Sequence, residues 1–176
     1  VPLQRIYAEI GRALEEELDY AKEARFGERI RTNLEEVDHV HVPALVDAYS
    51  RRGVICTEFF DGVKVTDKEA LDALGLDMHD VIRRLLDAYA HMFFVDGVFQ
   101  SDPHPGNLLV RRADDGGAEL CILDFGQSKV LPADFHGKLL RSAMAFMVRD
   151  VEGFSRSIVE MGMLSEAGAV AFSDDG

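Results

Sequence analysis

Ser101-Asp-Pro-His-Pro-Gly-Asn107, followed further along the chain by Leu123-Asp-Phe-Gly126, is the most informative part of this sequence. The first segment holds two prolines and a glycine, which predict a loop. Residues 108–110 and 120–123 are short apolar runs that predict two strands, and Asp115-Gly-Gly117 between them favours a hairpin connection. A tight loop followed by a hairpin would bring the two quoted segments together.

The side chains in these segments suit phosphoryl transfer. The transition state of that reaction spreads negative charge over the phosphate oxygens, so catalysis depends on positioning and on metal ions that neutralise the charge. Asp102 would accept the proton of the incoming hydroxyl group, and Asn107 and Asp124 would hold Mg²⁺ across the phosphates of ATP or ADP. Either motif alone is common in unrelated turns, but their order and their loop-and-hairpin context favour the joint interpretation.

Helices are predicted on both sides of this region. Apolar residues at helical spacing predict a helix over residues 2–36 and a buried helix over residues 77–97. Two more helices are expected at about 134–148 and 151–161, and residues 53–58 predict a strand. The apolar stripe of the second helix consists of Val81, Leu85, Tyr89 and Met92, flanked by Ile82, Leu86 and Phe93.

Charge and composition exclude some classes of protein. The net charge of −13, from 32 acidic and 19 basic residues, argues against a nucleic-acid-binding surface, which would need a basic face. An anionic nucleotide would therefore need metal ions to bind here. Cys56 and Cys121 lie in apolar runs without metal-ligand spacing and are interpreted as buried thiols. No apolar run reaches the ~18 residues of a membrane-spanning helix. We expect a cytoplasmic location, with attachment to a membrane surface made by segments outside this sequence.

Four segments resemble the motifs of the UbiB (AarF) family of atypical protein-kinase-like proteins. The two loops quoted above resemble its catalytic and metal-binding loops. Glu17-Leu-Asp-Tyr-Ala-Lys-Glu-Ala24 resembles its Glu-x-Asp signature with the helix glutamate that follows, and Thr57-Glu-Phe-Phe-Asp-Gly62 resembles its hinge. The resemblance implies an α+β, protein-kinase-like fold. A partial N-lobe with an αC-like helix and hinge strands is expected over residues 1–60, and a mostly helical, C-terminally incomplete C-lobe with short β-hairpins over residues 61–176.

The resemblance also implies a role for each matching residue. Asp102 stands at the place of the family's catalytic aspartate, and Asn107 and Asp124 stand at the places of its metal ligands. Glu23 matches the glutamate that pairs with a strand lysine, which orients the nucleotide phosphates. That lysine and the family's Lys-x-Gly-Gln helix are expected before residue 1, so we expect this chain by itself to be weak or inactive.

Glu17 and Asp19 match the Glu-x-Asp pair, which in the family faces the Lys-x-Gly-Gln helix over the active site, while Glu58 and Phe60 fall where the hinge backbone would meet adenine. On an ideal helix, Glu17 lies roughly 200° round from Asp19, so the two cannot both point into one pocket. Either one of them lies further out, on a solvated acidic face, or the helix is distorted there. His104 is interpreted as a loop side chain that braces the catalytic aspartate or faces solvent.

The leading hypothesis is an ATP-dependent atypical kinase or ATPase that uses Mg²⁺. The resemblance implies a role in ubiquinone or other isoprenoid-lipid metabolism, with a nucleotide and an isoprenoid lipid or lipid-metabolism proteins as partners, and peripheral membrane association of the parent protein. The alternative is a nucleotide-responsive module that binds a lipid or a protein without phosphoryl transfer. A lesser alternative is a small-molecule phosphotransferase of the aminoglycoside or choline kinase type, against which the Glu-x-Asp signature and the Asp-Phe-Gly spelling count.

Overall fold

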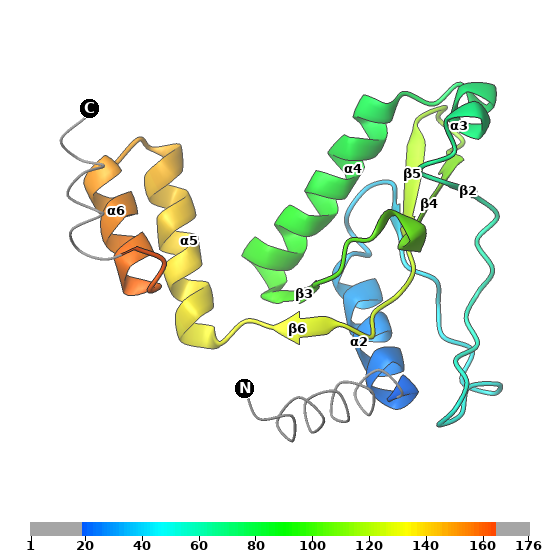
Figure 1. Cartoon of the computed structure of the whole chain (residues 1–176), viewed down its shortest axis with the longest axis horizontal. Helices are drawn as coiled ribbons and strands as arrows, with labels where there is room; N and C mark the ends of the chain where they lie inside the picture. Colours follow the sequence, from blue (N-terminus) through cyan, green and yellow to red (C-terminus); the bar gives the residue numbers. More distant parts are fainter. Residues whose placement is uncertain (1–18, 165–176) are drawn as a thin grey trace, which may run out of the picture. The chain divides into compact units, whose positions relative to one another are not determined.

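The computed structural model of the chain describes residues 19–164 (Figure 1). The chain divides into two compact units. Among the described residues, the first consists of residues 19–92 and 98–129, and the second of residues 93–97 and 130–164. The predicted boundary between an N-lobe and a C-lobe, at residues 60 and 61, falls inside the first of these units. The division into two lobes stays a prediction.

The first unit contains a four-stranded sheet, of which Figure 1 shows β4 (Leu108–Arg112) and β5 (Ala118–Ile122) beside α4 (Met78–Ala90). Its central pair is the predicted hairpin, in which β4 and β5 are antiparallel. β1 (Val40–His41) extends the sheet as a parallel neighbour of β5, and β2 (Val63–Lys64) as an antiparallel neighbour of β4. The order β1-β5-β4-β2 places the hairpin, whose ends carry the candidate residues, in the middle of the sheet.

The predicted buried helix is α4 (Met78–Ala90), continued by a π-helix over His91–Asp96. α4 packs against β5 and β1, and Met92 in the following π-helix is fully buried. The flanking residues Ile82 and Leu86 are exposed, so the apolar stripe predicted for this helix is too wide. The sheet covers one side of the helix, and these two side chains lie away from that side.

α2 (Tyr20–Asn33) is the described part of the helix predicted over residues 2–36, and residues 2–18 of that prediction lie outside the described residues. Asp19 has φ −85° and ψ 72°, which is not helical. Its carboxylate accepts a hydrogen bond from the Lys22 N–H at 3.0 Å and caps the helix. The prediction of a continuous helix is therefore wrong at Asp19, because this cap satisfies an N–H group that a helix start leaves without a partner.

The strand predicted over residues 53–58 is not formed, and the segment makes isolated antiparallel bridges instead of a ladder. Its backbone groups are satisfied locally. The Cys56 N–H donates to Ser50 Oγ at 3.0 Å, and the Cys56 carbonyl accepts from the Val46 N–H at 2.8 Å. Because the segment folds back onto the preceding turn, it needs no neighbouring strand to pair these groups.

The loop predicted over residues 98–107 contains two short elements. β3 (Val98–Gln100) pairs with β6 (Ser128–Val130) in a separate two-stranded sheet, and η2 (Pro105–Asn107) is one turn of 3-10 helix. α3 (Lys68–Leu74) is a further helix that the sequence did not predict. Two turns of helix contain too few residues for the apolar spacing to be recognised.

The second unit contains α5 (Ala133–Met147) and α6 (Val151–Glu160), which pack against each other. These helices confirm the two that the sequence predicts in this part of the chain. Arg141 and Glu160 form an ion pair of 3.3 Å between them. In the described part of the chain, no helix combines the length and the apolar composition needed to cross a bilayer.

Only one of the two cysteines is as buried as predicted. Cys121 is inaccessible on β5, where burial and, less strongly, the charge of Glu119 raise its pKa to about 12, whereas Cys56 is half-buried. Because the thiolate is the reactive form, we expect Cys121 to resist iodoacetamide at pH 8 until the chain is unfolded, and Cys56 to react first. Mass spectrometry with and without urea measures this, and rapid labelling of Cys121 in the folded chain would contradict its burial.

Candidate functional site

The hairpin register brings Asn107 and Asp124 together. Asn107 directly precedes β4 and Asp124 follows β5, and Leu108 lies opposite Ile122 in the antiparallel pair. The Leu123 N–H donates to the Asn107 carbonyl at 2.9 Å, which continues the pairing beyond the strands. As a result, Asn107 Nδ2 donates to Asp124 Oδ2 at 3.2 Å. The two predicted metal ligands are therefore adjacent.

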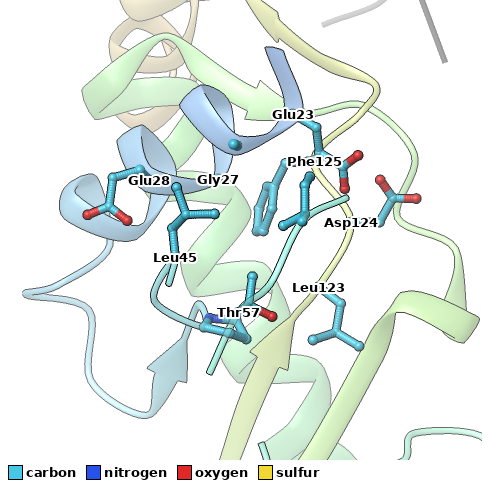
Figure 2. A pocket seen from close by; sticks show the side chains of 11 residues that line it. Glu23, Gly27, Glu28, Leu45, Thr57, Leu123, Asp124 and Phe125 are labelled. Atoms are coloured by element: carbon cyan, nitrogen blue, oxygen red, sulfur yellow. The ribbon is translucent and has the colours of Figure 1, made fainter. Parts of the chain in front are cut away.

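Glu23 brings a second carboxylate to this place from the first turn of α2. Figure 2 shows the carboxyl groups of Glu23 and Asp124 turned toward one another beside Phe125. A Cβ on Gly126 would lie 3.4 Å from Asp124 Oδ1 and 3.7 Å from Glu23 Oε2, so both carboxylates flank this glycine. Burial, and then repulsion by Asp124, raises the pKa of Glu23, although the Phe125 N–H partly offsets this effect by donating a hydrogen bond to the carboxylate.

A cavity of about 330 Å³ opens beside these carboxylates (Figure 2). Phe125 forms one wall, is 7% exposed, and lies against α2 where that helix has a glycine. A Cβ on Gly27 would approach Phe125 Cδ2 to 3.2 Å, so Gly27 allows the ring to lie close to the helix backbone. The complete lining is Glu23, Ala24, Gly27, Glu28, Pro43, Leu45, Ile55, Thr57, Leu123, Asp124 and Phe125.

The loop that carries Asp102 is held to the segment that follows Asp-Phe-Gly. The Ser101 N–H donates to the Gln127 carbonyl at 3.3 Å, and Ser101 Oγ donates to the same oxygen. The Asp102 carbonyl accepts from the His104 N–H at 2.7 Å, and the Asp102 side chain stays half-exposed. The fold therefore places the predicted base in the loop next to the predicted metal ligands.

His104 has a structural role in this loop. Its ring is exposed, and its Nδ1 accepts a hydrogen bond from the Gly106 N–H at 3.0 Å, which caps η2. A capping imidazole that accepts a backbone hydrogen bond has no free lone pair at that nitrogen for a metal ion. This geometry agrees with the interpretation of His104 as a bracing side chain of the loop.

Glu58 and Phe60, the two predicted hinge contacts, lie outside the cavity lining, although Thr57 of the same segment lines it. The Glu58 N–H donates to the Ala44 carbonyl at 2.8 Å, and Glu58 Oε2 lies 3.4 Å from His41 Nε2. The Phe60 ring is 4% exposed, stacks on His41 at 5.2 Å and lies under the Arg111 guanidinium at 4.4 Å. The side chain of Phe60 thus belongs to the core, and only its backbone can serve as the predicted hinge contact.

Glu17, the first residue of the Glu-x-Asp pair, lies outside the described residues, so only Asp19 can be placed. Asp19 is used as the N-cap of α2 and does not line the cavity. Sequence reasoning also missed the apolar side of the cavity, formed by Pro43, Leu45 and Ile55. Ile55 lies in the segment whose composition predicts a strand, and nothing in the local pattern indicates that these residues would face α2.

The repulsion between Glu23 and Asp124 predicts a pH effect. A carboxyl whose folded pKa is raised binds its proton more tightly in the folded chain, so stability falls as pH rises through the range from the unfolded to the folded pKa. We expect Glu23→Gln to raise the thermal midpoint at pH 7 and to leave it unchanged below about pH 4, near the unfolded pKa of a glutamate. Calorimetry from pH 3 to 8 measures this, with the exposed Glu69→Gln as control. An equal change in the thermal midpoint of Glu23→Gln at pH 7 and below about pH 4 would contradict the raised pKa of Glu23.

The donor set fits a hard divalent cation. Asp124 and Glu23 offer carboxylate oxygens, and Asn107 offers an amide oxygen once its side chain is turned. Within residues 19–164, no three or more His, Cys, Asp or Glu side chains form a complete metal cage. Mg²⁺ is usually bound by one or two carboxylates together with substrate phosphates and water, so this incomplete set suits a cation that arrives with a phosphate ligand.

Comparison with known proteins agrees with this geometry. A family model described as "ABC1 atypical kinase-like domain" matches residues 1–158. AarF domain-containing protein kinase 1 of Gallus gallus is 34% identical over 146 residues, which cover 81% of this chain and 28% of that protein. The chloroplastic protein ACTIVITY OF BC1 COMPLEX KINASE 8 of Arabidopsis thaliana is 31% identical over 163 residues, which cover 93% of this chain and 21% of that protein. The chain thus spans less than a third of the length of these relatives.

A solved structure resembles the chain in fold. Rv3197 of Mycobacterium tuberculosis, determined in complex with erythromycin, matches with a TM-score of 0.60 at 23% identity, over 90% of this chain and 39% of that one. This likeness and the family match confirm the predicted α+β, protein-kinase-like fold.

Proposed function

Because the chain belongs to the ABC1 atypical kinase-like family, which is also called UbiB or AarF, we propose that its site binds ATP with Mg²⁺ and transfers or hydrolyses the terminal phosphoryl group. One observation carries this proposal. Asn107 and Asp124 are in contact, and Glu23 lies close enough to Asp124 for its pKa to be raised by that charge. Two carboxylates this close repel each other, and the binding of a cation between them would remove this repulsion.

Each residue has a definite task in this proposal. Asp124 and Asn107 would hold the cation, and when bound Mg²⁺ would neutralise the charge that develops on the phosphate oxygens. Asp102 would accept the proton of the attacking hydroxyl group or water. Glu23 would pair with the strand lysine that is expected before residue 1, and that lysine would orient the nucleotide phosphates. The apolar lining of the cavity, which includes Pro43, Leu45 and Ile55, would exclude water from the side of the carboxylates that faces the cavity.

Several features favour an enzyme over the alternative hypothesis. A module that only binds a lipid or a protein has no physical need for a base and two cation ligands in adjacent loops. The family names support a phosphotransferase, and from family membership we propose an isoprenoid lipid, such as a ubiquinone precursor, or proteins of lipid metabolism as partners. We further propose a cytoplasmic location at a membrane surface for the full-length protein.

A thermal-shift titration with Mg²⁺ and ADP tests the binding step. We expect a stabilisation of about 2.7 kcal/mol at a ligand concentration 100 times Kd, because the ligand binds only the folded chain. Asp124→Asn should abolish this shift, since the neutral amide lacks the negative charge with which the Asp124 carboxylate would bind Mg²⁺. Asp87→Asn, which changes an exposed carboxylate on α4, should preserve the shift.

Two outcomes would count against the proposal. An equal shift in the parent and in Asp124→Asn would mean that the nucleotide binds elsewhere. The absence of a shift in the full-length protein would favour the binding-module hypothesis.

A further inference from the structure

Gln100 is a polar side chain enclosed in the core beside the candidate base. It is the last residue of β3 and is 2% exposed. A buried amide costs free energy unless its donors and acceptor are satisfied, so such a residue needs specific partners. Gln100 has them: Tyr89 Oη donates to Gln100 Oε1, and Gln100 Nε2 donates to the backbone carbonyl of Asp102.

These two hydrogen bonds define the orientation of the amide. The Asp102 carbonyl can only accept, so the NH₂ group of Gln100 must face it. The amide oxygen then faces Tyr89, whose hydroxyl must be the donor. Burial, and secondarily the negative charge of Asp102, raises the pKa of Tyr89 to about 12, so this hydroxyl keeps its proton at physiological pH.

Tyr89 connects this contact to the packed core of the first unit. It lies on α4, which packs against β5 and β1, and its ring packs partly into the core. The chain of contacts therefore runs from the helix through Gln100 to the Asp102 carbonyl. The same carbonyl also accepts from the His104 N–H at 2.7 Å. Both bonds restrain the backbone from which the Asp102 side chain projects.

We propose that Tyr89 and Gln100 are positioning residues that hold the Asp102 loop in its reactive geometry by anchoring the Asp102 carbonyl to α4. This inference rests on the proposed role of Asp102 as the base. Neither side chain lines the cavity, so neither is expected to contact the nucleotide. Their removal should therefore affect the rate of the chemical step and leave nucleotide binding in place.

The first test is Gln100→Leu in the full-length protein. We expect kcat to fall about 100-fold, the loss that misplacement by roughly 1 Å can cause, while KM for ATP stays within a factor of about two. The stabilisation by Mg²⁺ and ADP should be retained. Glu69→Leu is the control, because Glu69 is exposed on α3, outside the loop that carries Asp102.

A conservative variant separates positioning from simple loss of packing. A neutral imidazole can donate at one nitrogen and accept at the other, so Gln100→His can keep both hydrogen bonds and should restore most of kcat at pH 8. When the imidazole is protonated it can no longer accept from Tyr89. The Gln100→His protein should therefore lose activity near pH 6.5, a dependence that the parent lacks. Adding Tyr89→Phe to the Gln100→His protein should remove this loss of activity at acidic pH, because no hydroxyl then needs an acceptor at the imidazole.

A measurement that does not need turnover completes the test. Hydrogen exchange of the amides in residues 101–107 should accelerate in Gln100→Leu, while β4 and β5 remain protected. Unchanged exchange in this loop, or a rise in KM without loss of kcat, would overturn the positioning role. Failure of the proposed function is distinct, because it would appear as absent turnover in the parent protein with the exchange difference still present.

Discussion

In the full-length protein, Asp102→Asn is expected to lower kcat for phosphoryl transfer or ATP hydrolysis by about 10²–10⁴-fold, the usual contribution of a general base. Asparagine has nearly the same shape and can keep the loop hydrogen bonds, which use the backbone of residue 102. It cannot accept a proton at neutral pH. The loss should therefore appear in kcat, measured as phosphate release or substrate phosphorylation, while KM for ATP changes little.

Controls make this result specific to the base. Asp114→Asn changes an exposed carboxylate at the turn of the β4–β5 hairpin and should leave kcat unchanged. Asp102→Asn should also retain stabilisation by Mg²⁺ and ADP, unlike Asp124→Asn. Turnover that survives loss of Asp102 would remove the base from the proposed mechanism and favour a binding module.

Gly62→Ala is expected to destabilise the chain by about 1–3 kcal/mol, the usual cost of inserting a methyl group into a packed region. A Cβ at this position would lie 2.5 Å from Phe60 Cε1 and 2.9 Å from the Val110 carbonyl. The ring cannot move away easily, because His41 stacks on it and Arg111 lies over it. The carbonyl belongs to the central strand β4 and is equally constrained.

Gly53→Ala is the matched control for this substitution. Nothing lies within 4 Å of a Cβ at Gly53, so the methyl group meets no obstacle. Its expected effect is neutral or a stabilisation of about 0.4–1 kcal/mol from the reduced freedom of the unfolded chain. Urea denaturation of both variants measures the difference, and equal free energies of unfolding would show that the hinge adapts to the methyl group.

Some elements could be predicted from local sequence because their determinants are local. The β4–β5 hairpin follows from two apolar runs and a glycine-rich connection, and α4, α5 and α6 follow from apolar residues at helical spacing. Segment 53–58 has the composition of a strand, but the turn before it satisfies its backbone groups. The prediction was wrong there because strand formation depends on which partner is nearest in space.

The sequence by itself determined which residues can do chemistry: Asp102, Asn107 and Asp124, together with Glu23, through their types, order and spacing. The tertiary structure decided what those residues contact. It placed Glu23 against Asp124, enclosed Gln100 between Tyr89 and the Asp102 carbonyl, and left no room for a side chain at Gly62. Burial and charge repulsion depend on distances between segments far apart along the chain, and no local pattern records those distances.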